Sequence, residues 1–351
     1  MSKLNIGIIG AGGIANKLHL PQLMDIDEVK VAVVSGRKEH RLKILCDRFD
    51  IPRWTQNYEE VLADDSLDGI VVATPHPLHV GPGIKAMEAG KHLMMQKPLC
   101  GVMGEANAFV DAAEKSDSIV FCLPHFAPAI YAMRDLSARG DIGQVSGAYA
   151  RTSHGGPEVY YAEVLDAFEE KSDELWFFDA KQASVGALFD MGVYAVSCLV
   201  AMMGTVKNVI GRVKTIAKPT ELEDVATLIL EFENGALGTA ETSWCDPART
   251  GQMRIHGTAG KLTTPGEGGA ALSKWTPGSY TREDIPPTHE PVDLAPYQTG
   301  HGHALWVDCI KKGTTPELSN AHSARHVTEV LLAGLKSSEE GRSVDIESGV
   351  L

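Results

Sequence analysis

The stretch Leu4-Asn-Ile-Gly-Ile-Ile-Gly-Ala-Gly-Gly-Ile-Ala15 decides the fold of this chain. Its first six residues form an apolar run, which predicts a buried strand. The run ends in residues 10–15, which match the pattern G-x-G-x-x-G/A that leads from a strand into a helix around a dinucleotide pyrophosphate. We expect Gly10 to allow the tight turn, Gly12 to let the backbone approach the phosphates, and Ala15 to keep the helix near the strand.

A helix is predicted over residues 14–24, directly after this loop. The amide groups at the start of a helix favour negative charge, so they would face the phosphates. The residues expected to bind the dinucleotide here are Gly10, Gly12, Gly13, Ile14 and Ala15. The alternative is a purely structural glycine turn, which is common in α/β proteins.

The composition limits the class of protein. A chain of 351 residues is long enough for two domains, and 44% hydrophobic with 22% charged residues is ordinary for a globular protein. The formal net charge of −14 argues against nucleic acid and anionic membranes as partners. We expect no signal peptide and no apolar stretch that approaches the roughly 20 residues needed to span a bilayer.

The six cysteines are widely spaced and form no C-x-x-C pair. They predict reduced thiols in a cytoplasmic protein, without structural zinc or a disulfide framework.

The second predicted strand, over residues 29–34, ends where dinucleotide folds contact the adenosine ribose. A site that prefers NAD usually places Asp or Glu there. This chain has Ser35-Gly36-Arg37-Lys38 instead. The missing carboxylate and the two cations suit a 2′-phosphate, which favours NADP over NAD. The alternative is that Arg37 and Lys38 are solvated residues that open the next helix.

Two further strands are predicted to end at the same edge of the sheet. The strand over residues 69–73 leads into Thr74-Pro75-His76-Pro77-Leu78-His79. The next strand leads into Gln96-Lys97-Pro98, and Pro98 biases Lys97 towards extended geometry. Ligands of open α/β sheets bind at this edge, so Lys97 is a candidate catalytic residue. A plain surface charge is the alternative.

A helix over residues 186–194 carries a second chemical motif. Asp190 and Tyr194 are four residues apart, so both project from one face of the helix. An Asp on a buried face is costly unless it is paired or functional. The alternative is a capping Asp and a packed Tyr.

These motifs together resemble the Gfo/Idh/MocA family, named after glucose–fructose oxidoreductase, inositol dehydrogenase and MocA. Thr74-Pro75-His76-x-x-His79 is similar to the family's segment, and Gln96-Lys97-Pro98 stands where the family has Glu-Lys-Pro. The family motif Gly-x-x-x-Asp-x-Gly-x-His matches residues 186–194 except at Tyr194, a tyrosine that some branches share. At the crossover, His125 replaces the family's arginine.

The resemblance implies two domains and an enzyme. We expect a Rossmann domain (α/β) over residues 1–123 and an α+β domain over residues 124–351, built on a mostly antiparallel open sheet. Runs at 147–152, 206–214, 226–231, 236–243 and 252–255 supply its strands, and residues 265–300 form a surface excursion. In the family such a sheet commonly forms the subunit interface, so a homodimer or homotetramer is expected.

The activity implied is NAD(P)-dependent hydride transfer on a sugar, cyclitol or related polyol. Tyr194 or Lys97 would relay the proton, and Asp190 would orient the hydroxyl and Lys97. Substrate contacts are also expected from His125, His154 and Trp176. His301 and His303 are candidates as well, but no third metal ligand is identifiable beside them, so no metal is expected.

Two alternatives from other classes stay open. A glycosidase of this superfamily uses bound NAD transiently to oxidise, eliminate and reduce, and it would show no net reduction of the cofactor. A non-catalytic dinucleotide-binding regulator would not need Lys97, Asp190 and Tyr194 together.

Overall fold

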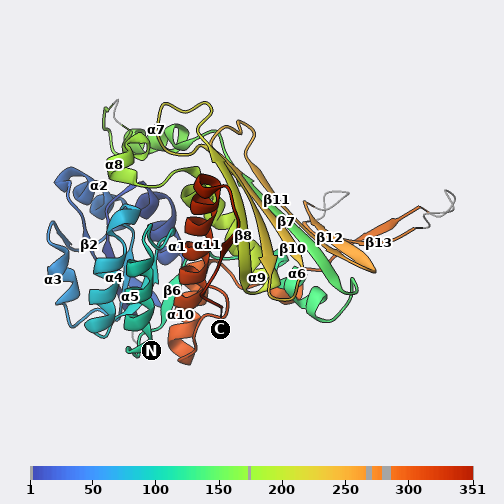
Figure 1. Ribbon diagram of the computed structural model, residues 1–351. Helices are drawn as coiled ribbons and strands as arrows, with labels where there is room; N and C mark the ends of the chain where they lie inside the picture. Colours follow the sequence, from blue (N-terminus) through green and yellow to red (C-terminus); the bar gives the residue numbers. More distant parts are fainter. Residues whose placement is uncertain (1–2, 173–174, 266–270, 279–285, 351) are drawn as a thin grey trace. The chain divides into compact units, whose positions relative to one another are not determined.

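The computed structural model describes residues 3–172, 175–265, 271–278 and 286–350. The chain forms two compact units (Figure 1). Unit 1 consists of Met1–His125, Gly156–Val185 and Gly300–Thr328, and unit 2 of Phe126–Gly155, Gly186–Thr299 and Glu329–Leu351. Unit 1 therefore includes two segments, 156–185 and 300–328, that the expected continuous division assigns to the second domain.

Unit 1 is built on a six-stranded parallel sheet in the order β3-β2-β1-β4-β5-β6, as expected for a Rossmann domain. Its strands are β1 (Leu4–Ile9), β2 (Val29–Ser35), β3 (Trp54–Thr55), β4 (Gly69–Val72), β5 (His92–Met95) and β6 (Val120–Cys122). The strand order reverses between β1 and β4. Ligands of this fold bind outside the carboxyl ends of the strands at such a point.

Two apolar cores cover the two faces of this sheet. Successive β1 side chains alternate between them, so Ile8 packs with Phe121 and Trp306, and Ile9 packs with Phe109 and the other core. The helices of unit 1 are α1 (Leu20–Met24), α2 (Glu39–Phe49), α3 (Tyr58–Leu62), α4 (Val80–Glu88), α5 (Met103–Glu114), α7 (Pro157–Ala167), α8 (Ala180–Ala183) and α10 (Gly302–Lys312). Short turns are η2 (His76–Leu78) and η3 (Trp176–Phe178).

The helix expected over residues 14–24 is not regular. A π-helical turn, η1 (Ala15–His19), precedes α1. Pro21 has no amide hydrogen, and its ring would clash with the carbonyl four residues earlier in a regular α-helix. A wider turn relieves this conflict and is a common cause of such bulges.

Unit 2 is built on a nine-stranded sheet in the order β14-β13-β12-β11-β7-β10-β9-β8-β15. Its strands are β7 (Val145–Ser153), β8 (Val206–Lys214), β9 (Val225–Phe232), β10 (Leu237–Ser243), β11 (Thr250–Gly257), β12 (Gly260–Thr264), β13 (Ser273–Thr276), β14 (Thr288–Pro291) and β15 (Val344–Asp345). β7 and β10 run parallel, and the other pairings among the described strands are antiparallel. The mostly antiparallel sheet is thus confirmed.

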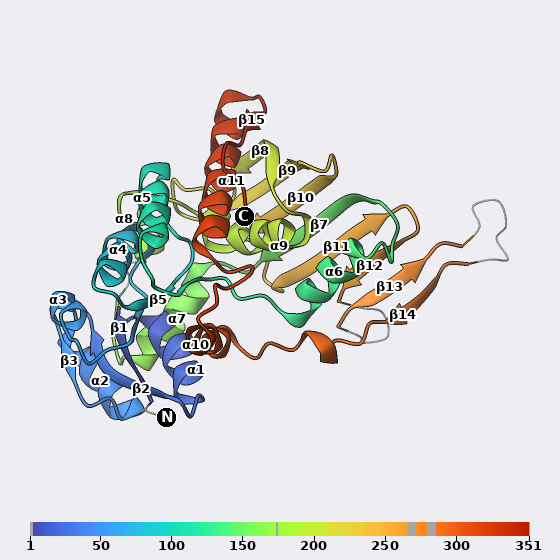
Figure 2. The same ribbon diagram turned by 90° about the horizontal axis from the view of Figure 1, so that it is seen from below.

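Helices cover one face of this sheet (Figure 2). α6 (Pro128–Ala138) packs on α9 (Val193–Met203), which lies against β7 and β10. The π-helical turn η4 (Leu188–Gly192) leads into α9, and the last part of α11 (Ala321–Glu340) lies against β8. Of the expected excursion over 265–300, the described parts include β13, β14 and the turn η6 (Ala295–Tyr297). Residues 266–270 and 279–285 lie outside the described residues.

The expectation about apolar stretches needs a correction. Residues Ala180–Met203 form a helical stretch of 24 residues with a mean hydropathy of 1.8 in its best window, long and apolar enough to cross a membrane. That window is 83% buried inside the protein, as in a core helix, so it is weak evidence for a membrane span. The stretch was missed because its apolar residues are interrupted by glycines and Asp190.

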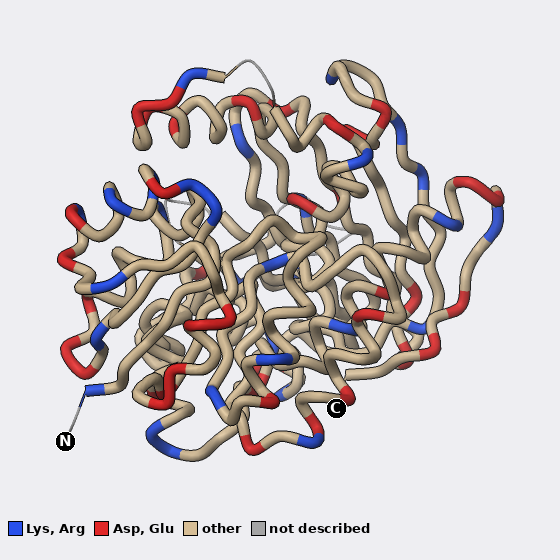
Figure 3. The backbone as a smooth tube through the Cα atoms, turned by 90° about the vertical axis from the view of Figure 1, so that its left-hand side faces the viewer, with Lys and Arg blue, Asp and Glu red and all other residues tan. Residues whose placement is uncertain are grey.

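Charged residues are distributed along the whole backbone. Figure 3 shows Lys and Arg interspersed with Asp and Glu. Each of the six cysteines is a free thiol.

Candidate functional site

The carboxyl ends of the parallel strands in unit 1 lie at one edge of the sheet. Gly10 follows β1, and its amide donates to the carbonyl of Ser35 at the end of β2 (2.9 Å). Gly10 has a φ of +120°, and a Cβ there would lie 2.4 Å from the backbone of Ala73, which follows β4. Only glycine fits this position, since both the backbone conformation and the close approach exclude a side chain.

The other residues of the fingerprint differ in whether a side chain would have space at their position. A Cβ on Gly12 would have no atom within 4 Å, which leaves room for a pyrophosphate beside the backbone. A Cβ on Gly13 would overlap Val164 and Tyr160 of α7, so this glycine also accommodates a helix. Ala15 is fully buried and Ile14 is half-buried. The loop therefore fits a dinucleotide, with α7 packed against one side of it.

At the end of β2 the predicted cations have different surroundings. Ser35 is buried, and a Cβ on Gly36 would lie 2.6 Å from the Cβ of Ala11, so β2 and the fingerprint loop touch here. Arg37 is exposed, and within the described part of the chain its guanidinium has no hydrogen bond or ion pair. Lys38, in contrast, donates to the carboxylate of Glu170 (2.7 Å), a residue that sequence reasoning missed.

The segment after β4 is held firmly against the protein. His79 is buried, with Nδ1 2.8 Å from the carbonyl oxygen of Pro98 and Nε2 2.7 Å from that of Thr74. Burial, the largest cause, lowers the His79 pKa to about 4. Because both ring nitrogens contact backbone carbonyls, His79 ties the end of β4 to the residues around Lys97. His79 and the nearby Thr74 and Pro75 stay predicted cofactor contacts.

The residues after β5 place Lys97 at the same edge. The amide of Gln96 donates to Val72 of β4 (3.1 Å), which extends the parallel ladder by one residue. The buried Gln96 side chain accepts from the amide of Lys97 (2.7 Å). Lys97 is half-buried and lies two residues beyond β5.

Gln96 begins a buried chain of hydrogen bonds with a defined direction. The side-chain oxygen of Gln96 accepts a hydrogen bond from the amide of Lys97, so the NH2 group of Gln96 faces Nε2 of His19 (3.4 Å). Nδ1 of His19 then donates to Nε2 of His303 (2.8 Å), and Nδ1 of His303 donates to Gln22 (2.7 Å). Burial lowers the His19 pKa to about 3 and places that of His303 well below its usual value. In this chain Nε2 of each imidazole faces the preceding donor and Nδ1 faces the following acceptor.

Two predicted residues of unit 1, His76 and His125, follow strands β4 and β6, and a third, His301, lies at the start of α10. His76 is buried, contacts the carbonyl of Ala183 and packs on Trp176, with ring centroids 5.7 Å apart. His125 is half-buried after β6, with its Cβ beside Gly302, and burial lowers its pKa. His301 caps α10 by accepting from Ala304 (3.2 Å). No group of three His, Cys, Asp or Glu residues in the described ranges is arranged to hold a metal.

In unit 2, Asp190 contacts Trp244 and His154, which follow two distant strands. The indole Nε1 of Trp244 donates to Oδ2 of Asp190 (2.9 Å), and Nε2 of His154 lies 3.5 Å from the same oxygen. The Trp244 side chain is fully buried, whereas the Asp190 side chain is 19% exposed. Asp190 is thus a partly accessible carboxylate held in place by a buried donor. Sequence reasoning singled out His154 but missed Trp244, because nothing local connects residue 244 with residue 190.

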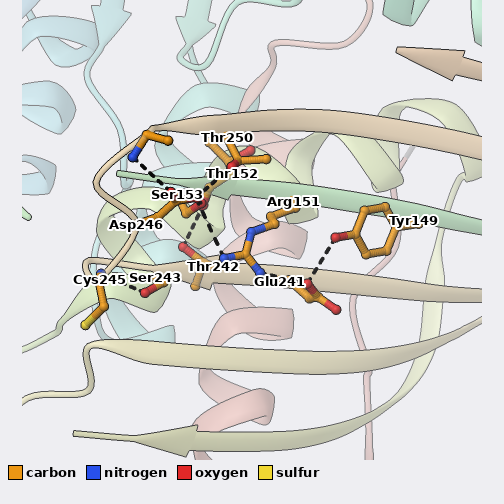
Figure 4. A network of polar contacts seen from close by, with 11 residues as sticks. Tyr149, Arg151, Thr152, Ser153, Glu241, Thr242, Ser243, Cys245, Asp246 and Thr250 are labelled. Carbon is orange, nitrogen blue, oxygen red and sulfur yellow. Dashed lines mark hydrogen bonds and ion pairs between the residues drawn. The ribbon is translucent and has the colours of Figure 1, made fainter. Parts of the chain in front are cut away.

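The parallel pairing of β7 with β10 brings these partners together. Ser153 and Ser243 are paired at the ends of the two strands, and His154 and Trp244 follow them directly. The amide of His154 donates to the carbonyl of Ser243 (3.0 Å). Beside this point, Arg151 lies between Glu241 (3.0 Å) and Asp246 (3.7 Å), which holds the two strand ends together (Figure 4).

The helix of the Asp190 motif begins on a buried carboxylate. Oε1 of Glu223 accepts from the amides of Gly186 (3.0 Å) and Leu188 (3.1 Å). Burial raises the pKa of Glu223. A Cβ on Gly186 would lie 2.3 Å from the Glu223 carbonyl oxygen, which explains the glycine at the start of the motif.

The expected helical face of this motif is only partly regular. Asp190 lies in the π-helical turn η4, and Tyr194 lies in the first turn of α9. Both side chains are half-buried. π-Helical turns widen the helix and recur at functional sites, so the turn adds support to this position.

Two family models match the chain. Residues 4–123 match the oxidoreductase family with an NAD-binding Rossmann fold, and residues 130–263 match the GFO/IDH/MocA C-terminal domain.

Relatives and solved structures agree with these matches. A D-xylose 1-dehydrogenase (NADP(+)) of Haloferax volcanii is 25% identical, and the alignment covers 97% of this chain and 99% of the relative. A trans-1,2-dihydrobenzene-1,2-diol dehydrogenase of Xenopus laevis is also 25% identical, over 95% of this chain and 90% of the relative. A levoglucosan dehydrogenase in complex with NADH and L-sorbose has the same fold, with a TM-score of 0.81, 21% identity, and coverage of 99% and 100%.

The fingerprint loop at the strand reversal, the strand-end lysine and both matched models lead to one conclusion. The chain belongs to the GFO/IDH/MocA family of NAD(P)-binding oxidoreductases.

Proposed function

We propose that this protein catalyses NAD(P)-dependent hydride transfer on a hydroxyl carbon of a sugar, cyclitol or related polyol. The observation that carries the proposal is the carboxyl edge of the parallel sheet in unit 1. Gly12, where a side chain would meet no atom, follows β1 there, and the half-buried Lys97 follows β5. The substrate class is supported by the names of relatives, which act on D-xylose and on a dihydrodiol.

Lys97, Asp190 and Tyr194 form the proposed catalytic set. A nicotinamide held at this edge would accept the hydride, so the side chains of the protein would have to move the hydroxyl proton. Free Lys and Tyr titrate near 10.4 and 10, and one of them has to be tuned downward to act near neutral pH. We assign the transfer of this proton to Lys97 or Tyr194.

Asp190 is the proposed orienting group. Its Oδ2 accepts from Trp244 and lies 3.5 Å from Nε2 of His154, and we assign this partly exposed carboxylate to orienting a substrate hydroxyl. A charge-assisted hydrogen bond from a buried indole fixes the carboxylate more strongly than a neutral one would. His154 and Trp176, together with His125, complete the proposed substrate contacts.

NADP is the proposed preferred cofactor. β2 ends in Ser35 and Gly36, without the carboxylate that usually accepts the ribose hydroxyls of NAD. The exposed Arg37 follows directly and is available to a 2′-phosphate. Gly10, Gly12 and Gln96 are proposed to line the rest of the dinucleotide, with His76 and His79 behind them.

A homodimer or homotetramer through the sheet of unit 2 is proposed as the assembly. The sheet face opposite α6 and α9 carries three exposed apolar side chains, Ile210, Ile229 and Leu237, on neighbouring strands. A charged network with Arg151 and Glu241 lies on the same face. Such a mixture of apolar and paired polar groups is typical of subunit interfaces.

The cytoplasm is the proposed compartment. It is supported by the free state of all six thiols, of which Cys100, Cys122 and Cys309 are buried.

The test follows nicotinamide absorbance with purified protein and a panel that includes D-xylose, levoglucosan, inositols and a cyclic trans-diol. NADP and NAD are supplied separately. Reduction of NADP by at least one compound is expected. If glycosides were cleaved without net reduction, the transient-redox glycosidase would replace this proposal. If nucleotide bound without any turnover across the panel, a non-catalytic role would replace it.

A further inference from the structure

A single carboxylate, Glu170, binds the basic side chains at the start of α2. Oε2 of Glu170 accepts from Lys38 Nζ (2.7 Å) and from a terminal nitrogen of Arg41 (2.7 Å). Its Oε1 accepts from Arg41 Nε and lies 2.6 Å from Nε2 of His40. Three basic residues within the first turn of one helix therefore share one acidic group from a segment about 130 residues away.

This contact is built into the protein rather than lying loosely on its surface. The Glu170 side chain is only 10% exposed and that of Arg41 only 14% exposed. The Arg41 guanidinium lies 4.8 Å from the ring centre of Phe168, which is itself buried in the core of unit 1. Glu169 has a φ of +54°, so the chain reverses after α7 and directs Glu170 back towards α2.

The contact lies near the end of β2, where this fold binds the adenosine ribose of a dinucleotide. Lys38 is three residues beyond Ser35, at the end of β2, where this fold distinguishes a ribose 2′-hydroxyl from a 2′-phosphate. A 2′-phosphate is recognised by the same donors, the ammonium of Lys38 and the fork of Arg41, that Glu170 already occupies. The acidic group that NAD-preferring enzymes carry on β2 is absent here, but another acidic group reaches the neighbouring cations from the segment after α7.

We propose that Glu170 determines cofactor specificity: its carboxylate competes with the 2′-phosphate of NADP for Lys38, His40 and Arg41 and so weakens the preference for NADP. The inference rests on the proposed function, because it requires the adenosine ribose to bind at the end of β2. Arg37, which Glu170 does not contact, then carries the larger part of the attraction for the phosphate.

The test compares the dissociation constants of NADPH and NADH, measured by nucleotide fluorescence, for the wild type, Glu170→Gln and Glu163→Gln. Glu163 is the matched control, because it lies on α7, pairs with Lys17 and is half exposed. Both variants remove one negative charge from the same segment. Glu170→Gln is expected to raise the ratio of NADPH to NADH affinity about tenfold, and Glu163→Gln to leave it within about twofold of the wild type.

Two results would overturn the inference. One is an unchanged ratio in Glu170→Gln, and the other is an equal loss of affinity for both nucleotides, which would indicate that Glu170 only anchors the segment after α7. Failure of both nucleotides to bind the wild type would overturn the proposed function itself, and this inference with it.

A second pair of variants keeps the test decisive if Glu170→Gln does not fold. Arg37→Gln and Lys38→Gln each remove one exposed cation near the end of β2. Because Glu170 already neutralises Lys38, Arg37→Gln is expected to reduce the NADPH preference more than Lys38→Gln. An equal or larger effect of Lys38→Gln would contradict the competition.

Discussion

The carboxyl edge of the parallel sheet in unit 1 and the β7–β10 edge in unit 2 assemble functional residues in different ways. In unit 1, Gly10 and Lys97 each lie one or two residues beyond a strand, so the strand itself delivers them to the edge. In unit 2, Asp190 lies on a helix, and its partners Trp244 and His154 arrive from strands 54 and 36 residues away. The first edge is encoded by local motifs, and the second by the pairing of two distant strands.

Both edges nevertheless share the same arrangement of strands and helical turns. In each unit, parallel strands end side by side, and a π-helical turn lies beside them: η1 after β1, and η4 before α9. The ends of parallel strands carry unpaired polar groups and loops at one edge of the sheet, and ligands of such sheets bind at this edge. The comparison therefore predicts that substitutions of the fingerprint glycines at the first edge act on cofactor binding and fold, whereas substitutions of Lys97 and of residues at the second edge act on turnover.

The largest effect is expected for Lys97→Ala. Loss of Lys97, one of the two proposed proton-transfer groups, should reduce kcat by about a thousandfold, because positioned acid–base groups contribute that much. Steady-state kinetics with the substrate found in the panel measures the change. Lys85→Ala, which removes an exposed lysine paired with Glu59, is the control and should keep normal turnover. Normal turnover in Lys97→Ala would refute the catalytic assignment.

Two glycines of the fingerprint should separate fold from binding. Gly10→Ala places a Cβ against the backbone of Ala73 at a φ of +120°, so it should lower the free energy of unfolding by about 3 kcal/mol. Gly12→Ala meets no atom within 4 Å and should leave the melting temperature unchanged, while NADPH affinity falls about tenfold. Urea unfolding and nucleotide titration measure the two effects. Equal behaviour of the two variants would show that the open space at Gly12 has no role in binding.

Trp244→Phe tests the second edge. Removing the indole donor from Asp190 should reduce kcat about tenfold, since a hydrogen bond to a charged group contributes about 1.5 kcal/mol or more. Trp306→Phe is the matched control, because Trp306 is equally buried and donates to a backbone carbonyl in unit 1 (3.3 Å). Both variants should lose some stability, but only Trp244→Phe should lose turnover. A similar drop in kcat for both would assign Trp244 a purely structural role.

The smallest effect is a difference in acid sensitivity between the units. Burial lowers the pKa of His19 to about 3 and of His79 to about 4, from an unfolded value of 6.5. The unfolded state binds these protons first, so their contribution to stability is present above pH 6.5 and is lost as the pH falls towards 4. Glu223 in unit 2 has a raised pKa, so its contribution changes in the opposite direction.

Hydrogen exchange measured across this pH range should therefore show amides of β1 and β4 losing protection before those of β9 and β10. The reverse order would mean that the buried histidines are not neutral in the folded protein.

The residues proposed to determine cofactor specificity could be predicted only in part from the local sequence. Ser35-Gly36-Arg37-Lys38 correctly indicates a β2 end without a carboxylate. It contains no sign that Glu170 pairs with Lys38 and Arg41, because that contact depends on the chain reversal after α7. Gly13 is a second residue whose surroundings the local sequence does not show. It stands at a variable position of the fingerprint, and the structure gives a packing reason for the glycine, the approach of Val164.

The sequence by itself determined the Rossmann sheet, the fingerprint loop, the strand-end position of Lys97, the mostly antiparallel second sheet and the family. These follow from apolar periodicity and from motifs within a few residues, whose geometry is local. Only the tertiary structure decided the partners of Asp190, the hydrogen bonds of His19 and His303, the contact of Glu170 with α2, and the discontinuous composition of unit 1. Each depends on segments brought together by strand pairing and core packing, which no local pattern records.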